Sequence, residues 1–437
     1  MLALWAMGLV PAMAVRAAGA QAAPAAAGLV QASPAPAAAL APVVSAPRAA
    51  RIARLMSGRA LWVKRDQMTT PERIVRFVDE AAENGYTVLF VQVRGRGDAW
   101  YRSDLVPLAS LLADARGADG APFDPLDYLL RRAHARGIEV HVWLNALLVW
   151  SGDTPPDDPG HVMNRHPDWV AVDADGRSLA DYSPADVRRA NIEGVFLAAG
   201  NPAVREHLRQ VIGEIAGRYA VDGIHLDYIR CPLVDSGYDR ASRAAFMAEC
   251  GVDPWKLRHG DQGLKERFGA GGLADLERRW RGWRAAQVTR LVREIRGDLD
   301  RLDRPVLLST AVFPDYRTAP SDVGQDWMTW CRGHLVDMVV PMFYSKSTDA
   351  VLRQLEVAQR AMPLDVLLYA GLAVYNQPLE SVVEKALLCQ RQGAQGICFF
   401  PYDTLAERPG SLRQLSRMSF GARSGRAAGL DNPVQIR

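Results

Sequence analysis

The sequence lacks several features that mark particular kinds of site or fold, and each absence argues against one of them. Its five cysteines are widely spaced and form no CxxC pair, so a zinc site is not indicated and at most two disulfides could form. The formal net charge is only +3 and the arginines are scattered, which gives no indication of a nucleic-acid partner. No glycine-rich phosphate loop follows the first strand-like segment, so a doubly wound nucleotide-binding sheet is not favoured.

The amino-terminal part has the character of a targeting segment followed by a linker. Residues 2–15 form an apolar run, Arg16 is the first charge, and small residues follow, which is typical of a cleavable export signal. The run is short for a bilayer span and no cysteine follows it, so no membrane or lipid anchor is expected. Residues 21–50 are rich in alanine and proline and have no acidic side chain, as in a disordered linker. We expect a signal peptide over 1–20, a linker over 21–57, and an exported protein, periplasmic or extracellular.

Strand-like segments then alternate with amphipathic helical stretches, the order that is typical of a parallel sheet. Helix signals lie between the strands, such as Thr70-Pro71 at a start and Gly137 after an end. Eight strand–helix units predict an α/β fold, a TIM (β/α)8 barrel over 58–410, with a loose tail over 411–437. The eight predicted strands are Leu61–Asp66, Thr87–Arg94, Ile138–Asn145, Gly223–Ile229, Val306–Phe313, Met338–Tyr344, Leu367–Leu372 and Gly396–Pro401.

Two long insertions follow predicted strands, at about 146–200 and about 231–283. The second is rich in tryptophan, with Trp255, Trp280 and Trp283. In this fold the loops at the carboxyl ends of the strands build the active site. The size of the insertions therefore predicts an extended substrate cleft.

One strand, within Gly223–Ile229, carries acidic and basic groups on a single face. Ile224 and Leu226 point to one side, and His225 and Asp227 to the other. The outer face of a barrel strand packs on helices, whereas the inner face rises to the mouth of the barrel. The alternation therefore predicts that Asp227 lies at the mouth.

Polar side chains share one face of the neighbouring strands as well. Burying such groups without partners costs about 1–3 kcal/mol each, so they bond one another or face a ligand. His141 and His225 lie deeper along their strands, where a structural polar layer is the favoured interpretation. Arg94, Asn145 and Asp227 stand at strand ends, where we expect them to face a ligand. The other polar residue of this face is Gln92, and Tyr344 ends the sixth strand.

Hydrolysis of a glycosidic bond needs two carboxyl groups, one protonated and one ionised. Asp227 supplies one of them. The second is expected from Asp326 or Asp315, which follow the fifth strand beside Asp227, and Asp403 is a weaker candidate. Trp327, next to Asp326, offers a ring on which a sugar could stack.

Two further aspartates, Asp222 and Asp337, come directly before strands instead of after them. They belong to the opposite end of the barrel. There we expect them to cap turns into the sheet, so they are not part of the predicted site.

Eight short blocks follow one another along the chain: 59–63 (RALWV), 91–94 (VQVR), 124–126 (DPL), 137–145 (GIEVHVWLN), 201–202 (NP), 222–230 (DGIHLDYIR), 325–327 (QDW) and 336–344 (VDMVVPMFY). In this order they resemble the glycosyl hydrolase-like 10 family of bacterial barrel proteins, from about Gly58 to Asp403. That family is similar to glycosidases that act on bacterial cell-envelope polysaccharide, including peptidoglycan glycan strands. The resemblance implies an exported cell-wall glycan hydrolase. Many relatives have Asp-Asp where this chain has Asp227-Tyr228.

We therefore predict an exported glycosidase that cleaves a cell-envelope polysaccharide, with peptidoglycan as the expected substrate and no metal or organic cofactor. The predicted catalytic residues are Asp227 with Asp326 or Asp315. Two alternatives stay open: a carbohydrate-binding barrel of the envelope without turnover, and a metal-dependent hydrolase that uses His141, His225 and Asp227. The sequence leaves the oligomeric state undecided. The predicted sugar-binding residues are Arg94, His141, Asn145, His225, Tyr228, Arg230, Trp327, Tyr344 and Tyr402.

Overall fold

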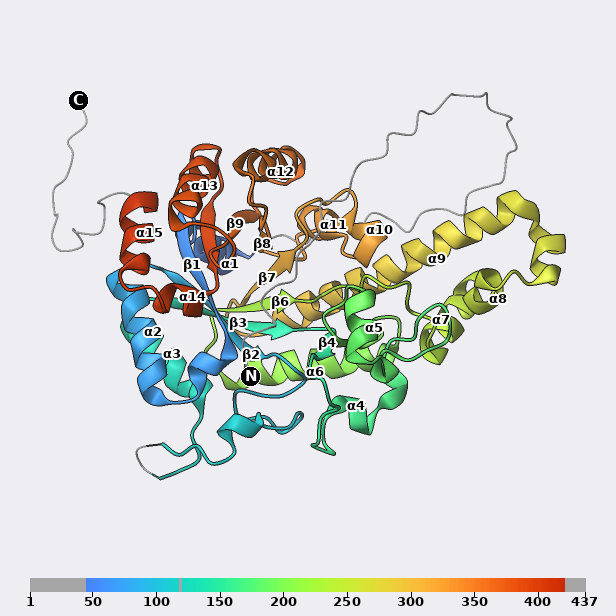
Figure 1. Ribbon diagram of the computed structural model, residues 1–437, viewed down its shortest axis with the longest axis horizontal. Helices are drawn as coiled ribbons and strands as arrows, with labels where there is room; N and C mark the ends of the chain where they lie inside the picture. Colours follow the sequence, from blue (N-terminus) through green and yellow to red (C-terminus); the bar gives the residue numbers. More distant parts are fainter. Residues whose placement is uncertain (1–44, 118–119, 421–437) are drawn as a thin grey trace. The chain divides into compact units, whose positions relative to one another are not determined.

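Eight parallel strands close into a barrel in the computed structural model, which describes residues 45–117 and 120–420 (Figure 1). The order around the barrel is β1-β2-β3-β6-β7-β8-β9-β10, and β10 pairs with β1. The predicted TIM barrel is confirmed, although β1 begins at residue 58 instead of 61. The barrel strands are β1 (Gly58–Val63), β2 (Val88–Arg94), β3 (Glu139–Asn145), β6 (Gly223–Asp227), β7 (Leu307–Val312), β8 (Met338–Pro341), β9 (Leu367–Ala373) and β10 (Gly396–Phe400).

Helices surround the strands (Figure 1). Their starts follow local sequence rules: Thr70 and Asp124 each accept a hydrogen bond from a backbone N–H of the first turn, and proline occupies the first helical position. The helices between barrel strands include α2 (Pro71–Glu83), α3 (Pro125–Ala135), α6 (Pro202–Arg218), α9 (Gln262–Leu299), α10 (Ala319–Val323), α11 (Trp327–Arg332), α12 (Thr348–Ala361) and α13 (Leu379–Arg391), and α14 (Tyr402–Ala406) follows β10.

Residues of each strand alternate between two hydrophobic cores, as the period of two requires. Ile224 and Leu226 of β6 belong to the outer core, between strands and helices. Trp62, Phe90 and Trp143 belong to the inner core, within the barrel. The predicted alternation along β6 is therefore confirmed.

Helix α1 (Ala46–Arg54) covers the amino-terminal end of the barrel. Arg48 forms an ion pair with Asp337, and Arg51 forms one with Asp222. Leu55, directly after the helix, is buried in the inner core. The prediction of a linker over 21–57 is thus wrong for its last part, because arginines at helical spacing bind this end of the barrel. The rest of that linker and the predicted signal peptide lie outside the described residues.

The predicted loose tail is also partly ordered. Helix α15 (Ser411–Phe420) packs with Leu412 and Leu415 buried in the outer core. The hydroxyl of Ser416 donates a hydrogen bond to the carbonyl of Asn84, 2.5 Å away. The prediction is therefore wrong for 411–420, and the remainder of the tail lies outside the described residues.

The first insertion, 146–200, contains the antiparallel pair β4 (Leu148–Trp150) and β5 (Val195–Phe196) with the short helices α4 (Val162–Arg165) and α5 (Pro184–Arg189). The second holds α7 (Arg240–Cys250), α8 (Pro254–Arg258) and the first part of α9, which extends away from the strands (Figure 1). Trp280 and Trp283 are buried with Phe246 in a small separate core. These two tryptophans stabilise the insertion and do not line a cleft.

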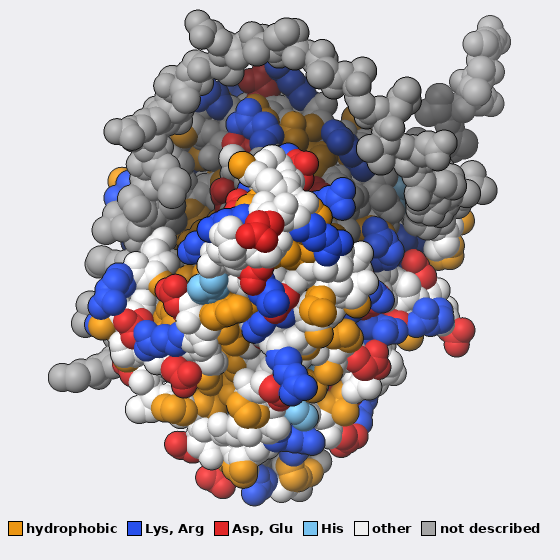
Figure 2. All heavy atoms as spheres, turned by 90° about the vertical axis from the view of Figure 1, so that its right-hand side faces the viewer, with side chains coloured by type: hydrophobic (Ala, Val, Ile, Leu, Met, Phe, Trp, Pro, Cys, Tyr) orange, Lys and Arg blue, Asp and Glu red, His pale blue; other side chains and the backbone are white. Residues whose placement is uncertain are grey.

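Acidic and basic side chains alternate on the face at the far end of α9, without a large patch of one charge (Figure 2). This distribution agrees with the small net charge of the whole chain. Within residues 45–117 and 120–420, no helix is both long enough and apolar enough to cross a bilayer.

Candidate active site

Asp227 ends strand β6 at the carboxyl end of the barrel, in register with Asn145 at the end of β3. Its side chain is half-buried, and one carboxyl oxygen accepts a hydrogen bond of 2.7 Å from the backbone N–H of Tyr228. Burial raises the pKa of Asp227 to about 6, and the negative charge of Glu193 acts in the same direction. A carboxyl with this pKa is partly protonated near neutral pH, as a general acid must be.

The residue after Asp227 has a strained backbone. Tyr228 has a φ of +49°, in the left-handed region that residues with a side chain seldom adopt. This turn places the N–H of Tyr228 against the carboxyl of Asp227. Such strain persists where the surrounding structure enforces it, often at functional sites.

Beside this turn, Arg230 forms an ion pair with a glutamate from the first insertion. An Nη of Arg230 lies 2.6 Å from Oε1 of Glu193, which comes two residues before β5. The other oxygen of Glu193, Oε2, is buried and has no hydrogen-bond partner in the described part of the chain. Three rings surround the guanidinium at 4.9–5.5 Å: Phe196, Tyr228 and Phe313.

Aromatic side chains line the other side of the mouth, at the ends of β8, β9 and β10. Tyr344 stacks on Phe400 with ring centroids 5.9 Å apart, and Tyr375 meets both rings edge-on. Burial raises the pKa of Tyr344 well above its usual range, and the charge of Asp227 adds to the shift. Tyr344 thus lies near Asp227, and all three rings are half-buried, whereas sugar binding by Tyr344 stays a prediction. Partly exposed rings of this kind suit contact with sugar rings.

Asn145 lies at this mouth as predicted, but its side-chain amide is hydrogen-bonded to other groups of the protein. Its oxygen accepts from the indole of Trp143 at 3.0 Å and from Gln92 at 3.2 Å. Its nitrogen donates to the carbonyl of Gly95 at 2.9 Å. Asn145 therefore holds Trp143 and the end of β2 in place, and sugar binding by its side chain remains a prediction.

His141 and His225 belong to a structural layer deep in the barrel, which corrects their assignment as sugar ligands. Both are fully buried. The ring of His225 is hydrogen-bonded to the indole of Trp62 at 3.0 Å and to the hydroxyl of Ser309 at 2.9 Å. With both nitrogens of His225 engaged, the metal-dependent alternative loses a ligand. Over residues 45–117 and 120–420, no group of three or more histidine, cysteine, aspartate or glutamate side chains could hold a metal ion.

Arg94 is turned away from the mouth by an irregularity in β2. The register against β3 shifts between Gln92 and Arg94, so that Arg94 pairs with the outward residue Leu144. It is fully buried, and it donates hydrogen bonds to the carbonyls of Asn145 and Ala146. The prediction that it binds a sugar is corrected, because strict alternation missed the bulge.

Two aromatic residues predicted to bind sugar are core residues. Trp327 is fully buried, and its indole donates to the carbonyl of Phe313 at 3.0 Å. Tyr402 is fully buried too, and its hydroxyl donates to Glu80 of α2 at 2.8 Å. Both predictions are corrected, because buried rings have no face left for a ligand.

The predicted second carboxyls already have local partners. Asp315 pairs with Arg317 at 2.7 Å, a contact that lowers the pKa of the carboxyl. Asp326 caps α11 by accepting a hydrogen bond from the N–H of Thr329. Asp403, the weaker candidate, lies 2.6 Å from Lys64. The carboxylate whose charge raises the pKa of Asp227 is instead Glu193.

The family model described as glycosyl hydrolase-like 10 matches residues 58–388, which cover the barrel from β1 into α13. The chain belongs to the glycosyl hydrolase-like 10 family. The resemblance inferred from the eight sequence blocks is thereby confirmed, and the residues around Asp227 lie within the matched region.

Two curated proteins are similar to this member of the glycosyl hydrolase-like 10 family. Glycosyl hydrolase YngK of Bacillus subtilis (strain 168) is 23% identical over 303 residues, which are 65% of this chain and 51% of YngK. Glycosyl hydrolase DigH of Escherichia coli (strain K12) is 28% identical over 161 residues, which are 34% of this chain and 32% of DigH. The chain thus spans about half the length of YngK and about a third of the length of DigH.

Solved structures with a similar fold include glycoside hydrolases. The glycoside hydrolase domain of PgaB (BpsB) from Bordetella bronchiseptica has a TM-score of 0.57 at 15% identity, covering 84% of this chain and 100% of that chain. Alpha-L-fucosidase isoenzyme 2 from Paenibacillus thiaminolyticus has a TM-score of 0.52 at 13% identity, covering 84% of this chain and 48% of that chain. At these identities the likeness shows the fold alone.

Sequence reasoning missed several residues at the mouth of this glycosyl hydrolase-like 10 barrel. Phe400 ends β10, where the alternation test could have found it. Tyr375 and Glu193 lie in loops, where no periodicity points to a side chain.

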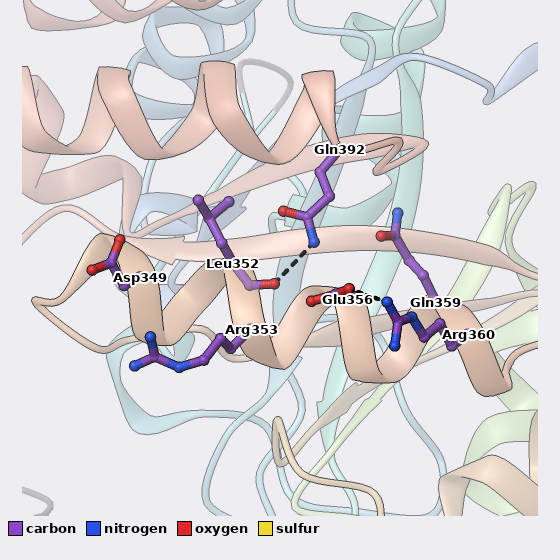
Figure 3. Close-up of a pocket in the computed structure, with 7 residues that line it drawn as sticks. All are labelled: Asp349, Leu352, Arg353, Glu356, Gln359, Arg360 and Gln392. Carbon is purple, nitrogen blue, oxygen red and sulfur yellow. Dashed lines mark hydrogen bonds and ion pairs between the residues drawn. The ribbon is translucent and has the colours of Figure 1, made fainter.

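A hollow of about 550 Å³ lies elsewhere, between α12 and α13, and is lined mainly by charged and amide side chains (Figure 3). None of its lining residues belongs to the group around Asp227.

Proposed function

We propose that this protein is a glycoside hydrolase in which Asp227 is the general acid. The observation that carries the proposal is a half-buried carboxyl at the carboxyl end of a barrel strand, with a pKa raised to about 6. Membership of the glycosyl hydrolase-like 10 family supports the same reaction class. As the bond between the sugar C1 and the leaving oxygen breaks, Asp227 gives its proton to that oxygen.

The aromatic residues at the mouth would hold the sugar rings. Tyr344, Tyr375 and Phe400 present partly exposed faces at the ends of three adjacent strands. Tyr228 and Arg230, both predicted sugar ligands, lie after the end of β6 beside Glu193. Because Arg230 is buried and paired with Glu193, we propose that the sugar next to Asp227 contacts Tyr228 and not the arginine, which corrects the prediction of Arg230 as a sugar ligand.

We propose that the substrate is a cell-envelope polysaccharide, with the glycan strands of peptidoglycan as the first candidate. This rests on the family resemblance and on the export signal expected over 1–20. An exported protein should lack that segment when it is isolated from its own cell. Mass measurement of its amino terminus, together with cell fractionation, tests this part.

The central experiment incubates the purified protein with purified peptidoglycan, with and without stem peptides, and identifies released ends by mass spectrometry. We expect new reducing ends from the wild type and none from Asp227→Asn. Binding to the glycan without any new ends in either protein would contradict the proposal and support the alternative of a carbohydrate-binding barrel.

A further inference from the structure

Glu193 and Asp403 share one arrangement within the described residues: one carboxylate oxygen pairs with a cation, and the other is buried without a hydrogen-bond partner. Of these two residues, Glu193 is the one whose charge raises the pKa of Asp227. One oxygen of Glu193 is held by Arg230, which is itself 3% exposed and enclosed by aromatic rings. The other oxygen is buried and unpartnered within residues 45–117 and 120–420. An unpaired buried carboxylate oxygen costs free energy, so it is retained where a ligand or a reacting group pairs with it. The same carboxylate acts electrostatically on Asp227 and Tyr228.

We propose that Glu193, from the first insertion, is the second catalytic carboxylate and faces Asp227 across the scissile bond. This inference rests on the proposed glycosidase function and names a residue that the sequence did not point to. Arg230 is then a positioning residue, because it fixes Oε1 and leaves Oε2 free for the sugar or for water. The insertion that builds one wall of the mouth also delivers the acid.

The proposed step balances with water as the only co-reactant. Asp227 gives its proton to the leaving oxygen while the C1–O bond breaks. Glu193 either bonds to C1, to be displaced later by water, or removes a proton from a water that attacks C1. In both cases the sugar gains the hydroxyl, and the second proton of the water returns to the carboxyl pair.

The first test compares Glu193→Gln with wild type on purified peptidoglycan. We expect kcat to fall by a factor of about 10²–10⁴, the usual range for loss of an acid or base. Glu356→Gln is the matched control, because Glu356 also pairs with an arginine, Arg360, but on α12 in the hollow of Figure 3. The control should keep kcat within about twofold of wild type. A kcat for Glu193→Gln as high as that of the control would overturn the inference.

A purely structural role is distinguished by Glu193→Asp and by rescue. Aspartate keeps the charge but withdraws the carboxylate by one methylene, so kcat should still fall while KM changes little. In Glu193→Ala, added azide should attack C1, the leaving oxygen should take the proton of Asp227, and a glycosyl azide should form. A kcat of Glu193→Asp equal to wild type, or the absence of any glycosyl azide, would overturn the catalytic role.

The two proposals fail in different ways. If wild type releases no ends from any glycan, the proposed function falls, and the inference falls with it. If wild type cleaves and Asp227→Asn does not, but all Glu193 variants cleave like wild type, only the inference is contradicted.

The pH dependence of carbodiimide labelling at Asp227 gives a measurement that does not depend on turnover. Loss of the Glu193 charge should move the pKa of Asp227 downward, and an unchanged labelling profile would contradict the closeness of the two carboxyls.

Discussion

Each end of the barrel has a buried or half-buried aspartate, and the pKa values of these two residues, Asp222 and Asp227, are shifted in opposite directions. At the amino-terminal end, Asp222 accepts hydrogen bonds from the imidazole of His134 at 2.8 Å and from the N–H of Val140 at 2.7 Å, and it pairs with Arg51. Burial alone would raise its pKa, but these partners outweigh burial and lower it. At the mouth, Asp227 has fewer partners, and burial raises its pKa to about 6.

Asp337 repeats the arrangement of Asp222 at the start of β8. It forms ion pairs with Arg48 and Arg296, and the backbone N–H of Leu308 donates to it at 2.8 Å. An aspartate whose oxygens are all paired ties elements of the fold together. An aspartate left with an incomplete set of partners has a raised pKa and is partly protonated near neutral pH, as the proposed general acid requires. The structural aspartates and Asp227 therefore differ in the number of their hydrogen-bond and ionic partners, although the residue type is the same.

The sharpest test of this comparison is the replacement of one aspartate at each end. Asp227→Asn should lower kcat on a cleaved glycan by a factor of about 10²–10⁴, because the amide cannot donate the proton. Asp222→Asn should leave kcat within about twofold wherever the variant is folded. Activity is measured as reducing ends released per unit time, with circular dichroism confirming the fold. Equal losses in both variants would contradict the division between the two ends.

The next largest effect concerns stability. Asp337→Ala removes the buried carboxylate that Arg48 and Arg296 share and leaves them the partly exposed Asp300 as ionic partner, so we expect a loss of up to about 3–5 kcal/mol in the free energy of unfolding. Urea denaturation followed by tryptophan fluorescence measures it. An exposed aspartate such as Asp349, changed to alanine, serves as the control. A loss for Asp337→Ala no larger than for the control would show that this end of the barrel does not depend on the ion pairs.

The raised pKa of Asp227 also predicts a gain in stability for Asp227→Asn at high pH. The unfolded chain ionises this carboxyl near pH 4, whereas the folded protein does so at about 6, so ionisation destabilises the fold as pH rises between these values. Above pH 6 the variant should be more stable than wild type by about 1–3 kcal/mol, and below pH 4 the two should be equal. Thermal unfolding at pH 4 and pH 8 checks this. A difference independent of pH would mean that the carboxyl is not buried.

The smallest expected effect is at His134, which is partly exposed. Its hydrogen bond to Asp222 raises its pKa, so the stability from this contact is complete below pH 6.5 and is lost as pH rises through the raised value. His134→Asn should therefore cost less than about 1 kcal/mol, and only at low pH, because solvent screens the pair. Unfolding free energies of the two proteins at pH 5 and pH 9 provide the measurement. A larger loss at pH 9 than at pH 5 would refute the assignment.

The prediction from sequence worked best where the chain repeats a local period. Alternation along β6 placed Asp227 at the mouth and Ile224 in the outer core, because successive side chains of a strand must face opposite ways. It failed at Arg94, where a register shift in β2 reversed the facing. A bulge inserts one residue against the partner strand, and one strand read alone does not reveal its partner.

Composition misled at the start of the barrel domain and at one aromatic residue within it. The alanine-rich stretch before residue 57 has the character of a linker, yet Arg48 and Arg51 find buried aspartates more than 170 residues away along the chain. Trp327 has an aromatic ring of the kind that stacks on sugars, yet this residue of helix α11 is fully buried. Whether a particular ring is buried depends on which other helices and strands pack against it, and composition does not show this.

The chain by itself determined the eight-stranded barrel, the family and the position of Asp227, because each depends on short periods or ordered blocks that can be read locally. Tertiary structure alone decided which acid stands near Asp227. Glu193 lies in a loop of an insertion, 34 residues before Asp227, and its neighbourhood with Arg230 exists only because β5 and the end of β6 are brought together. Loop residues carry no period, so only the closed fold reveals their partners.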